Sequence, residues 1–198
     1  MGKKLVLKMA NIFSEIEEEI FFNENLAFDE EKIKKYILEF LGNKINEKEQ
    51  SQKGFYFEEI IYNFFEYMNI PLTKSLKTRD FGIDGIVKFD IGFLGEIDLG
   101  LQIKYKLIDS TDVDLFLSAL KNAELQLGVI VCKDSRNLVK YELNSKLKAI
   151  LFSKGIKIKE KLINENVNLN PVFILKFEEV AEFVASQIRA FVKSVYKK

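Results

Sequence analysis

The sequence predicts an α/β fold in which a mixed β-sheet is flanked by helices and preceded by a helical N-terminal extension. Three observations predict it: apolar residues recur at helical spacing through the first 50 residues, helical and strand-like segments alternate after a polar stretch, and the two earliest strands are joined by a short segment. A chain of 198 residues buries roughly 70% of its unfolded surface on folding, so a stable core requires neither a disulfide nor a structural metal.

Two helices are expected in the N-terminal extension. Their apolar stripes, spaced as on one helix face, are Ile12, Phe13, Ile16 and Ile20 and then Ile33, Tyr36, Ile37, Phe40 and Leu41. Gly42 and Asn43 are expected to end the second helix. The polar segment 43–53 predicts a linker, which divides the chain into an extension over residues 1–50 and a main domain over residues 54–198.

Helices and strands alternate through the main domain. The expected elements are a helix at 54–68, strands at 82–89 and 99–106, a helix at 113–125 capped by Ser110, Thr111 or Asp112, a strand at 128–132, a basic helix at 135–152, a strand at 172–177 and a helix at 178–195. The short connection 90–98 favours an antiparallel hairpin, whereas strands separated by a helix can pair in parallel. We therefore expect a mixed sheet.

Composition excludes several classes of catalytic and metal site. The chain has no histidine and a single cysteine, Cys132, so it cannot form a Ser-His-Asp or Cys-His catalytic group, a histidine zinc site or a cysteine-rich metal site. Its chemistry must therefore come from carboxylates, lysines, amides, hydroxyls and metals that prefer oxygen ligands.

No segment resembles a membrane anchor or a secretion signal. No apolar run approaches the roughly 18 residues needed to span a membrane, the segment 1–8 breaks off before a secretory apolar region forms, and Val6 stands where an N-myristoylation signal needs Ser or Thr. We therefore expect a cytoplasmic protein without a membrane partner.

The zero net charge conceals two oppositely charged regions. Residues 15–31 contain eight acidic and no basic side chains, and residues 133–161 contain nine basic against three acidic ones. Either these are two solvated helix faces, or the basic region is the one face that meets a polyanion.

Four polar residues are expected to converge on one edge of the sheet. Side chains two apart on a strand share a face, so Gln102 and Lys104 project together. Asp84 belongs to the neighbouring strand and can lie beside them. On the helix 54–68, Glu58 lies at the edge of the apolar arc and can turn toward the sheet.

Oxygen ligands and a lysine at one place suit metal-assisted hydrolysis of phosphodiesters. Mg²⁺ takes hard oxygen ligands and usually keeps several waters, so one or two carboxylates and a substrate phosphate suffice to hold it. The metal lowers the pKa of a bound water and neutralises charge on the phosphate, while a lysine orients the nucleophile or stabilises the transition state. Mg²⁺, or Mn²⁺ in its place, is the expected cofactor.

Three motifs gather these residues: Gly-Phe-Tyr-Phe-Glu at 54–58, Asp-Phe-Gly-Ile-Asp-Gly at 80–85 and Gln-Ile-Lys-Tyr at 102–105. In them the sequence resembles the PD-(D/E)XK nuclease superfamily, and within it the Mrr-like restriction endonucleases, in which Gln-x-Lys replaces the more general Glu-x-Lys. The resemblance covers about residues 54–132. It implies a restriction-endonuclease-like fold and a metal-dependent DNA endonuclease that acts in restriction, defence or DNA processing.

The resemblance also implies a role for each residue of the site. Asp84 would be a metal ligand, Gln102 would supply an oxygen where relatives use Glu, and the Ile103 carbonyl would complete the metal shell. Lys104 would be the catalytic lysine, and Glu58 would be the auxiliary metal ligand on the helix.

DNA is the expected partner of such an enzyme. The basic residues expected to contact its phosphates are Lys77, Arg79, Lys106, Lys133, Arg136 and Lys140. Because cleavage of both strands needs two active sites, a homodimer is expected.

The same residues are also compatible with purely structural roles. Asp84, before Gly85, suits turn chemistry at a strand entrance, and Lys104 would continue a row of exposed residues if its strand lay at the edge of the sheet. Tyr105 is expected on the buried face rather than as a platform for stacked bases. For function, the alternatives are a catalytically silent nuclease-fold protein that binds DNA or a protein partner, and a nuclease specific for branched DNA such as Holliday junctions.

Overall fold

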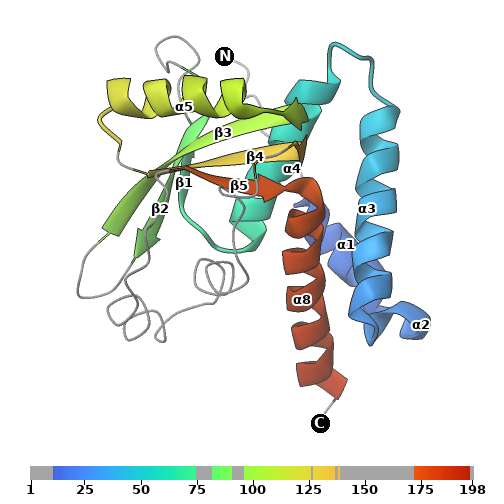
Figure 1. Ribbon diagram of the computed structural model, residues 1–198. Helices are drawn as coiled ribbons and strands as arrows, with labels where there is room; N and C mark the ends of the chain where they lie inside the picture. Colours follow the sequence, from blue (N-terminus) through green and yellow to red (C-terminus); the bar gives the residue numbers. More distant parts are fainter. Residues whose placement is uncertain are drawn as a thin grey trace, which may run out of the picture.

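A five-stranded mixed sheet forms the centre of the molecule in the computed structural model, which describes residues 11–74, 82–90, 96–125, 127–136, 138 and 172–196 (Figure 1). Its strands, in their order across the sheet, are β1 (Leu72–Lys74), β2 (Gly85–Asp90), β3 (Glu96–Ile108), β4 (Leu127–Ser135) and β5 (Val172–Lys176). β1, β2 and β3 pair antiparallel, whereas β3, β4 and β5 pair in parallel. The predicted mixed sheet and its antiparallel hairpin are confirmed.

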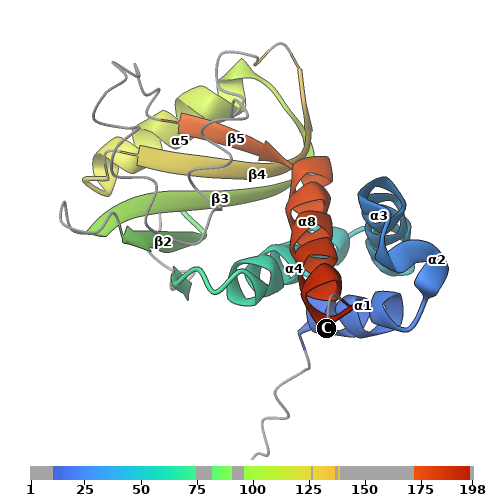
Figure 2. The same cartoon turned by 90° about the horizontal axis from the view of Figure 1, so that it is seen from below.

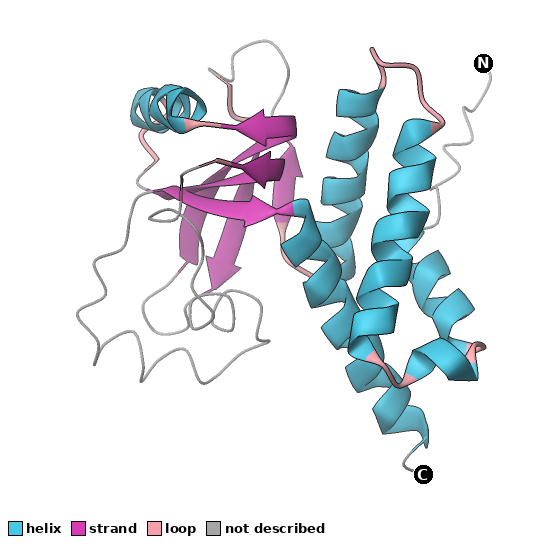
Figure 3. Ribbon diagram, turned by 45° about the vertical axis from the view of Figure 1, so that its right-hand side comes forward, coloured by secondary structure: helices cyan, strands magenta, loops and turns pink. Residues whose placement is uncertain are grey.

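Helices cover both faces of the sheet. α5 (Ser110–Asn122) lies on one face, and α4 (Lys53–Tyr67) and the C-terminal helix α8 (Phe177–Tyr196) lie toward the other (Figure 2). The N-terminal helices α1 (Ile12–Phe21), α2 (Glu24–Ala27) and α3 (Glu30–Asn46) pack beyond α4 and α8, so one side of the sheet carries a group of helices (Figure 3). The α/β architecture with its helical N-terminal region is confirmed. Among the helices of the described residues, none is both long and apolar enough to cross a membrane.

The alternation of side chains along β3 divides the interior into two cores. Leu99, Leu101 and Ile103 point into the larger core, which the helices α1, α3, α4 and α8 complete. Gly100 lies on the opposite face, toward α5, where Ile130 of β4 and the apolar side of α5 form the smaller core. Residues at even positions of β3 therefore face α5, which decides where the side chains of the candidate site point.

The N-terminal helices share the larger core with the main domain. Phe13 of α1 and Leu41 of α3 are fully buried in the same cluster as Phe57 of α4 and Val184 of α8. The predicted boundary near residues 50–54 lies at the end of the loop before α4 and at the first residues of that helix, and it stays a prediction.

The predicted end of the second helix was wrong. α3 runs through Gly42 and Asn43 to Asn46. Leu41 and Ile45 are buried in the larger core, and their packing holds the last turns of the helix despite the weak helix propensity of Gly42 and Asn43.

The predicted cap of the helix after β3 was also wrong. α5 begins at Ser110, and its cap is Asp109, whose side chain accepts hydrogen bonds from the backbone N–H groups of Thr111 and Asp112. A capping-box partner, Asp112, accepts a bond from the Asp109 N–H in return, and it is this reciprocal pair that sets the start of the helix.

Two strand boundaries differ from the prediction. β1 was not predicted, because three residues are too few to show an alternating pattern. Ser135 is the last residue of β4 rather than the start of a basic helix. Most of the predicted helix 135–152 lies outside the described residues, as do Lys77, Arg79, Asp80 and Lys140.

Two glycines let α5 approach the sheet closely. Gly100 and Gly128 are paired neighbours on β3 and β4. A Cβ atom at Gly100 would lie 2.4 Å from Leu120, and one at Gly128 would lie 2.6 Å from the ring of Phe116. The bare backbone at this pair therefore forms the surface on which the helix packs.

Substituting Gly128 by alanine should lower the free energy of unfolding by about 1–3 kcal/mol, because the added methyl group forces the buried Phe116 ring out of its position. A matched control is Gly42→Ala, which meets no atom within 4 Å. Because Gly42 lies inside α3, that change should raise stability by about 0.5–1 kcal/mol. Urea denaturation measures both, and equal stabilities of the two variants would contradict the packing described.

Candidate active site

Asp84 is held at the entrance of β2 by three hydrogen bonds from different directions. Its backbone N–H donates to the Leu101 carbonyl at 2.7 Å, and its carboxylate Oδ2 accepts from the Ile103 N–H at 2.6 Å. The hydroxyl of Tyr62, on α4, donates to the Asp84 carbonyl at 3.1 Å. The carboxylate is therefore oriented by β3 and its backbone is tied to α4, which is a more constrained arrangement than turn chemistry alone requires.

Gln102 is buried beside it, with 8% of its surface exposed. Its Nε2 donates to the Gly82 carbonyl at 2.6 Å, which fixes the orientation of the side-chain amide. The amide oxygen Oε1 is fully buried and has no hydrogen-bond partner among the described residues. Leaving a buried acceptor unpaired costs about 1–3 kcal/mol, so an oxygen in this position calls for a water or a cation as its partner.

Gly82 makes this amide contact possible. Its φ is +88°, a conformation that side-chain-bearing residues rarely adopt, and a Cβ here would lie 3.2 Å from Gln102 Nε2. The glycine thus allows the backbone before Asp84 to fold over Gln102. Gln102 and Ile103, neighbours on β3, therefore both bond to this segment, Gln102 to the Gly82 carbonyl and Ile103 to the Asp84 carboxylate.

Lys104 points toward α5 on the same face of the sheet as Gln102. Its Nζ lies 2.9 Å from Asp112 Oδ1, and Lys106 Nζ lies 2.8 Å from the same oxygen. The predicted common face of Gln102 and Lys104 is confirmed, because both lie on the α5 side of β3. The alternative of an exposed row was wrong at Gln102, which is buried, although at Lys104 itself β3 pairs with β4 alone.

Asp112 is the residue of this cluster that sequence reasoning did not assign to the site. It has 5% of its surface exposed and closes the capping box of α5. Burial alone would raise the pKa of its carboxyl, but hydrogen bonds from Lys106 and Lys104 more than offset this, so its pKa lies below the ordinary value. The sequence signal was its position three residues after Asp109, which is typical of a capping box.

β3 carries an irregularity directly after Lys104. Lys104 pairs with Cys132 and Leu107 pairs with Asp134, so the β3 side has one residue more than the β4 side between these pairs. Such bulges bend a strand and change the direction of its side chains, and they are frequent beside active sites. Lys106, inside the bulge, reaches the same Asp112 oxygen as Lys104.

Glu58 lies on the side of α4 that approaches Asp84. It is half-buried and one helical turn before Tyr62, whose hydroxyl bonds to the Asp84 backbone. The neighbouring Phe57 is fully buried against Tyr105 and Phe177, with ring centroids 5.2 and 5.3 Å apart. Glu58 therefore lies at the border of the apolar arc, as its spacing predicts.

Cys132 offers no alternative nucleophile. It is fully buried on β4, opposite Lys104. Burial raises the pKa of its thiol to about 12, so it stays protonated at neutral pH.

The structure gives a partner to each predicted residue of the β2–β3 site. Asp84 bonds to the Ile103 N–H, Gln102 bonds to the Gly82 carbonyl, and Lys104 bonds to Asp112. No group of three or more Asp, Glu or Cys side chains that could hold a metal ion occurs within the described residues. The oxygen groups of the site are the Asp84 carboxylate, which accepts from the Ile103 N–H, and the buried Gln102 Oε1, which has no partner among the described residues.

The described basic residues that were predicted to contact DNA have different surroundings. Lys106 is engaged by Asp112, Lys133 lies over the Tyr105 ring with its Nζ 5.1 Å from the centroid, and Arg136 is exposed just after β4. Tyr105 packs on the larger core, as predicted, and is partly exposed at its outer side.

Comparison with known proteins gives little further information. No protein-family model matches the chain, and no curated protein matches its sequence. Among solved structures it is similar to a chain described as MspJI restriction endonuclease in complex with a 27-mer oligonucleotide, with 14% identity and a TM-score of 0.34. The match covers 84% of this chain and 36% of that one, so this chain spans about a third of its length.

Proposed function

We propose that this protein is a metal-dependent endonuclease that hydrolyses phosphodiester bonds in DNA, of the Mrr-like type that the Gln-x-Lys motif resembles. The observation that carries the proposal is that one short segment, 82–84, bonds to two neighbouring residues of β3: the Asp84 carboxylate accepts from the Ile103 N–H at 2.6 Å, and the Gly82 carbonyl accepts from the amide of Gln102, whose buried Oε1 has no partner among the described residues. A carboxylate and an amide oxygen are both ligands that suit a hard divalent cation.

The residues present fit Mg²⁺ or Mn²⁺. Asp84 and Gln102 would hold the ion, and Glu58 and the Ile103 carbonyl are the further ligands that we propose for it. When bound, the metal would supply Lewis-acid activation of a water and charge neutralisation at the phosphate. A neutral amide in place of a carboxylate lowers the negative charge of the site. The substrate phosphate would therefore contribute more of the binding energy for the metal ion.

The chain's own groups prepare the site before any ligand arrives. The Ile103 N–H and the Tyr62 hydroxyl fix the orientation and the backbone of Asp84, so little reorganisation is needed when the substrate binds. Lys104 has 21% of its side chain exposed and can reach a phosphate oxygen or a water at the surface of the sheet. Asp112, which also engages Lys106, limits how far this ammonium group moves.

A second candidate is a catalytically silent nuclease fold that binds DNA or a protein partner. Two observations favour it: within the described ranges no three carboxylates gather around one point, and both lysines of the site are already paired with Asp112. A charge that is satisfied inside the protein is less available for catalysis.

Incubation of the full chain with supercoiled plasmid distinguishes the two functions. The nuclease should produce nicked and linear DNA when Mg²⁺ or Mn²⁺ is present and no product when EDTA is added. A parallel reaction on branched junction DNA tests specificity for DNA structure, and sedimentation tests the homodimer that double-strand cleavage would use. If no DNA is cut and calorimetry detects no binding of Mn²⁺, the silent fold is the better description.

A further inference from the structure

A cavity of about 410 Å³ lies where the ends of β3 and β4 meet the start of α4. Three separate segments line it, and the lining residues are Asn46, Gln50, Lys53, Tyr105, Lys106, Leu107, Lys133 and Asp134. Tyr105 projects from the face of β3 opposite to Lys104, so this cavity is distinct from the candidate active site.

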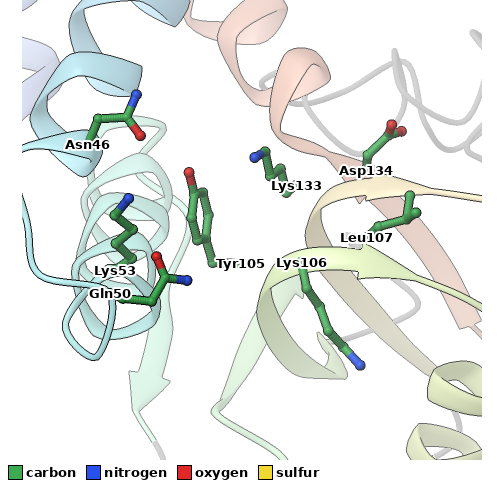
Figure 4. Close-up of a pocket in the computed structure, with 8 residues that line it drawn as sticks. All are labelled: Asn46, Gln50, Lys53, Tyr105, Lys106, Leu107, Lys133 and Asp134. Carbon is green, nitrogen blue, oxygen red and sulfur yellow. The ribbon is translucent and has the colours of Figure 1, made fainter.

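Polar groups from these segments converge on the open space. Figure 4 shows the amides of Asn46 and Gln50, the amine of Lys53, the hydroxyl of Tyr105 and the amine of Lys133 turned toward a common region. The amine of Lys106 points away, to Asp112.

The converging groups have little to bind within the protein. In the part of the chain that the structure describes, the side chains of Asn46, Gln50 and Lys53 have no hydrogen-bond or ion-pair partner. Lys133 lies over the Tyr105 ring, which keeps its charge at the cavity without neutralising it. Asn46, Gln50 and Lys133 are exposed, so in the free protein their polar groups meet solvent and are available to a ligand that enters the recess.

The chemistry of the lining indicates an anionic ligand with hydrogen-bonding edges. The lysines outnumber the acidic lining residue Asp134, which favours a phosphate group. The start of α4 also favours an anion, because a helix N-terminus carries a partial positive charge. Its N-cap residue, Gln52, makes no side-chain hydrogen bond to the N–H groups of the first turn. Asn and Gln amides pair with the edges of bases, and the cavity volume lies within the range of small-ligand pockets, about 300–1,000 Å³.

We propose that this cavity binds a nucleotide, with its phosphate between Lys53 and Lys133 and the amides of Asn46 and Gln50 at its base or sugar. The ligand is either a free mononucleotide or one nucleotide unit of a single-stranded nucleic acid. The proposal does not rest on the nuclease function, because none of these four residues belongs to the set proposed to hold the metal or to act on the phosphodiester.

Isothermal titration of the full chain in EDTA tests this binding while excluding metal-dependent cleavage. The probes are the 5′-mononucleotides, inorganic phosphate and a short single-stranded oligodeoxynucleotide. Lys53→Gln and Lys133→Gln should each weaken nucleotide binding about tenfold, the loss of one charge-assisted hydrogen bond. Lys53→Arg, which keeps the charge, should bind within a few-fold of the wild type.

The control variant is Lys35→Gln, on the exposed face of α3, which should leave binding unchanged. Binding of mononucleotides identifies a free nucleotide as the ligand, and binding of the oligonucleotide alone, sensitive to the same two lysines, identifies a strand. The proposal is overturned if neither the mononucleotides nor the oligonucleotide bind at millimolar concentration, or if phosphate binds as tightly as a nucleotide. It is also overturned if both lysine variants bind the nucleotide as tightly as the control variant does. Thermal melting of each variant confirms that it is folded.

Discussion

Replacing Asp84 by asparagine should lower the rate of DNA cleavage by about 10²- to 10³-fold, the scale of removing one fixed electrostatic group from an active site. Asparagine has the same shape and can still accept the Ile103 hydrogen bond through its amide oxygen, so the fold should be retained. The charge that would hold the cation is lost. The measurement is the initial rate of plasmid nicking at saturating Mn²⁺, together with the affinity for Mn²⁺ by calorimetry.

The matched control for this substitution is Asp98→Asn. Asp98 is an exposed carboxylate on β3, where it lies 3.7 Å from the Lys88 amine. Exposed pairs of this kind contribute at most about 1 kcal/mol, so the control should cleave DNA at the wild-type rate. Metal-dependent cleavage that survives Asp84→Asn undiminished would show that the catalytic carboxylate is elsewhere, even if the protein is a nuclease.

Replacing Asp112 by alanine should lower the free energy of unfolding by about 2–4 kcal/mol at pH 7, the sum expected for a helix cap and charge-assisted hydrogen bonds. One buried carboxylate holds two lysines from β3 and returns a hydrogen bond to the Asp109 N–H. Removing it leaves Lys104 without its anionic partner and breaks the capping box. Chemical denaturation measures the loss.

The stability that Asp112 contributes to the fold should decrease as the pH falls. Burial raises the pKa of its carboxyl, but the hydrogen bonds from Lys106 and Lys104 outweigh this, so the pKa in the folded protein lies below the ordinary value for aspartate. A carboxylate with a depressed pKa contributes stability above its unfolded pKa and loses it as the pH falls through the folded value. The difference between wild type and Asp112→Ala should therefore be constant near neutral pH and shrink below about pH 4.

Asp114→Ala is the comparison for Asp112. Asp114 is exposed on the same helix, and its carboxylate has no hydrogen-bond or ion-pair partner among the described residues, while its backbone carbonyl accepts from the Ser118 hydroxyl. This variant should change stability by no more than about 0.5 kcal/mol. If Asp112→Ala and Asp114→Ala unfold at the same denaturant concentration, the carboxylate does not hold the two lysines in solution.

Most of the correct predictions came from the spacing of apolar and polar residues along strands and helices. The alternation along residues 99–106 placed Gln102 and Lys104 on one face and Tyr105 on the other, and helical spacing placed Phe57 in the core with Glu58 at its border. These features depend on local backbone geometry, which repeats every two or 3.6 residues and is therefore visible in the order of residue types. The short connection between two strands likewise indicated their antiparallel pairing.

Boundaries and partners were less predictable. α3 continues past Gly42 because its last turn is buried against other helices, and local propensity contains no information about that burial. Lys104 pairs with Asp112 on α5, a partner that the sequence did not indicate. The partner of a long side chain depends on how a helix crosses the sheet, which here follows from the close packing allowed by Gly100 and Gly128.

The sequence by itself determined the α/β class, the faces on which the site residues lie, and the kinds of chemistry that a chain without histidine can perform. Only the tertiary structure decided that β3 is the central strand, that Gln102 has a buried oxygen without a partner among the described residues, and that Lys53 and Lys133 share a cavity. The first set depends on interactions between residues close in the chain. The second depends on contacts between segments far apart in it, which are set by packing of the whole core.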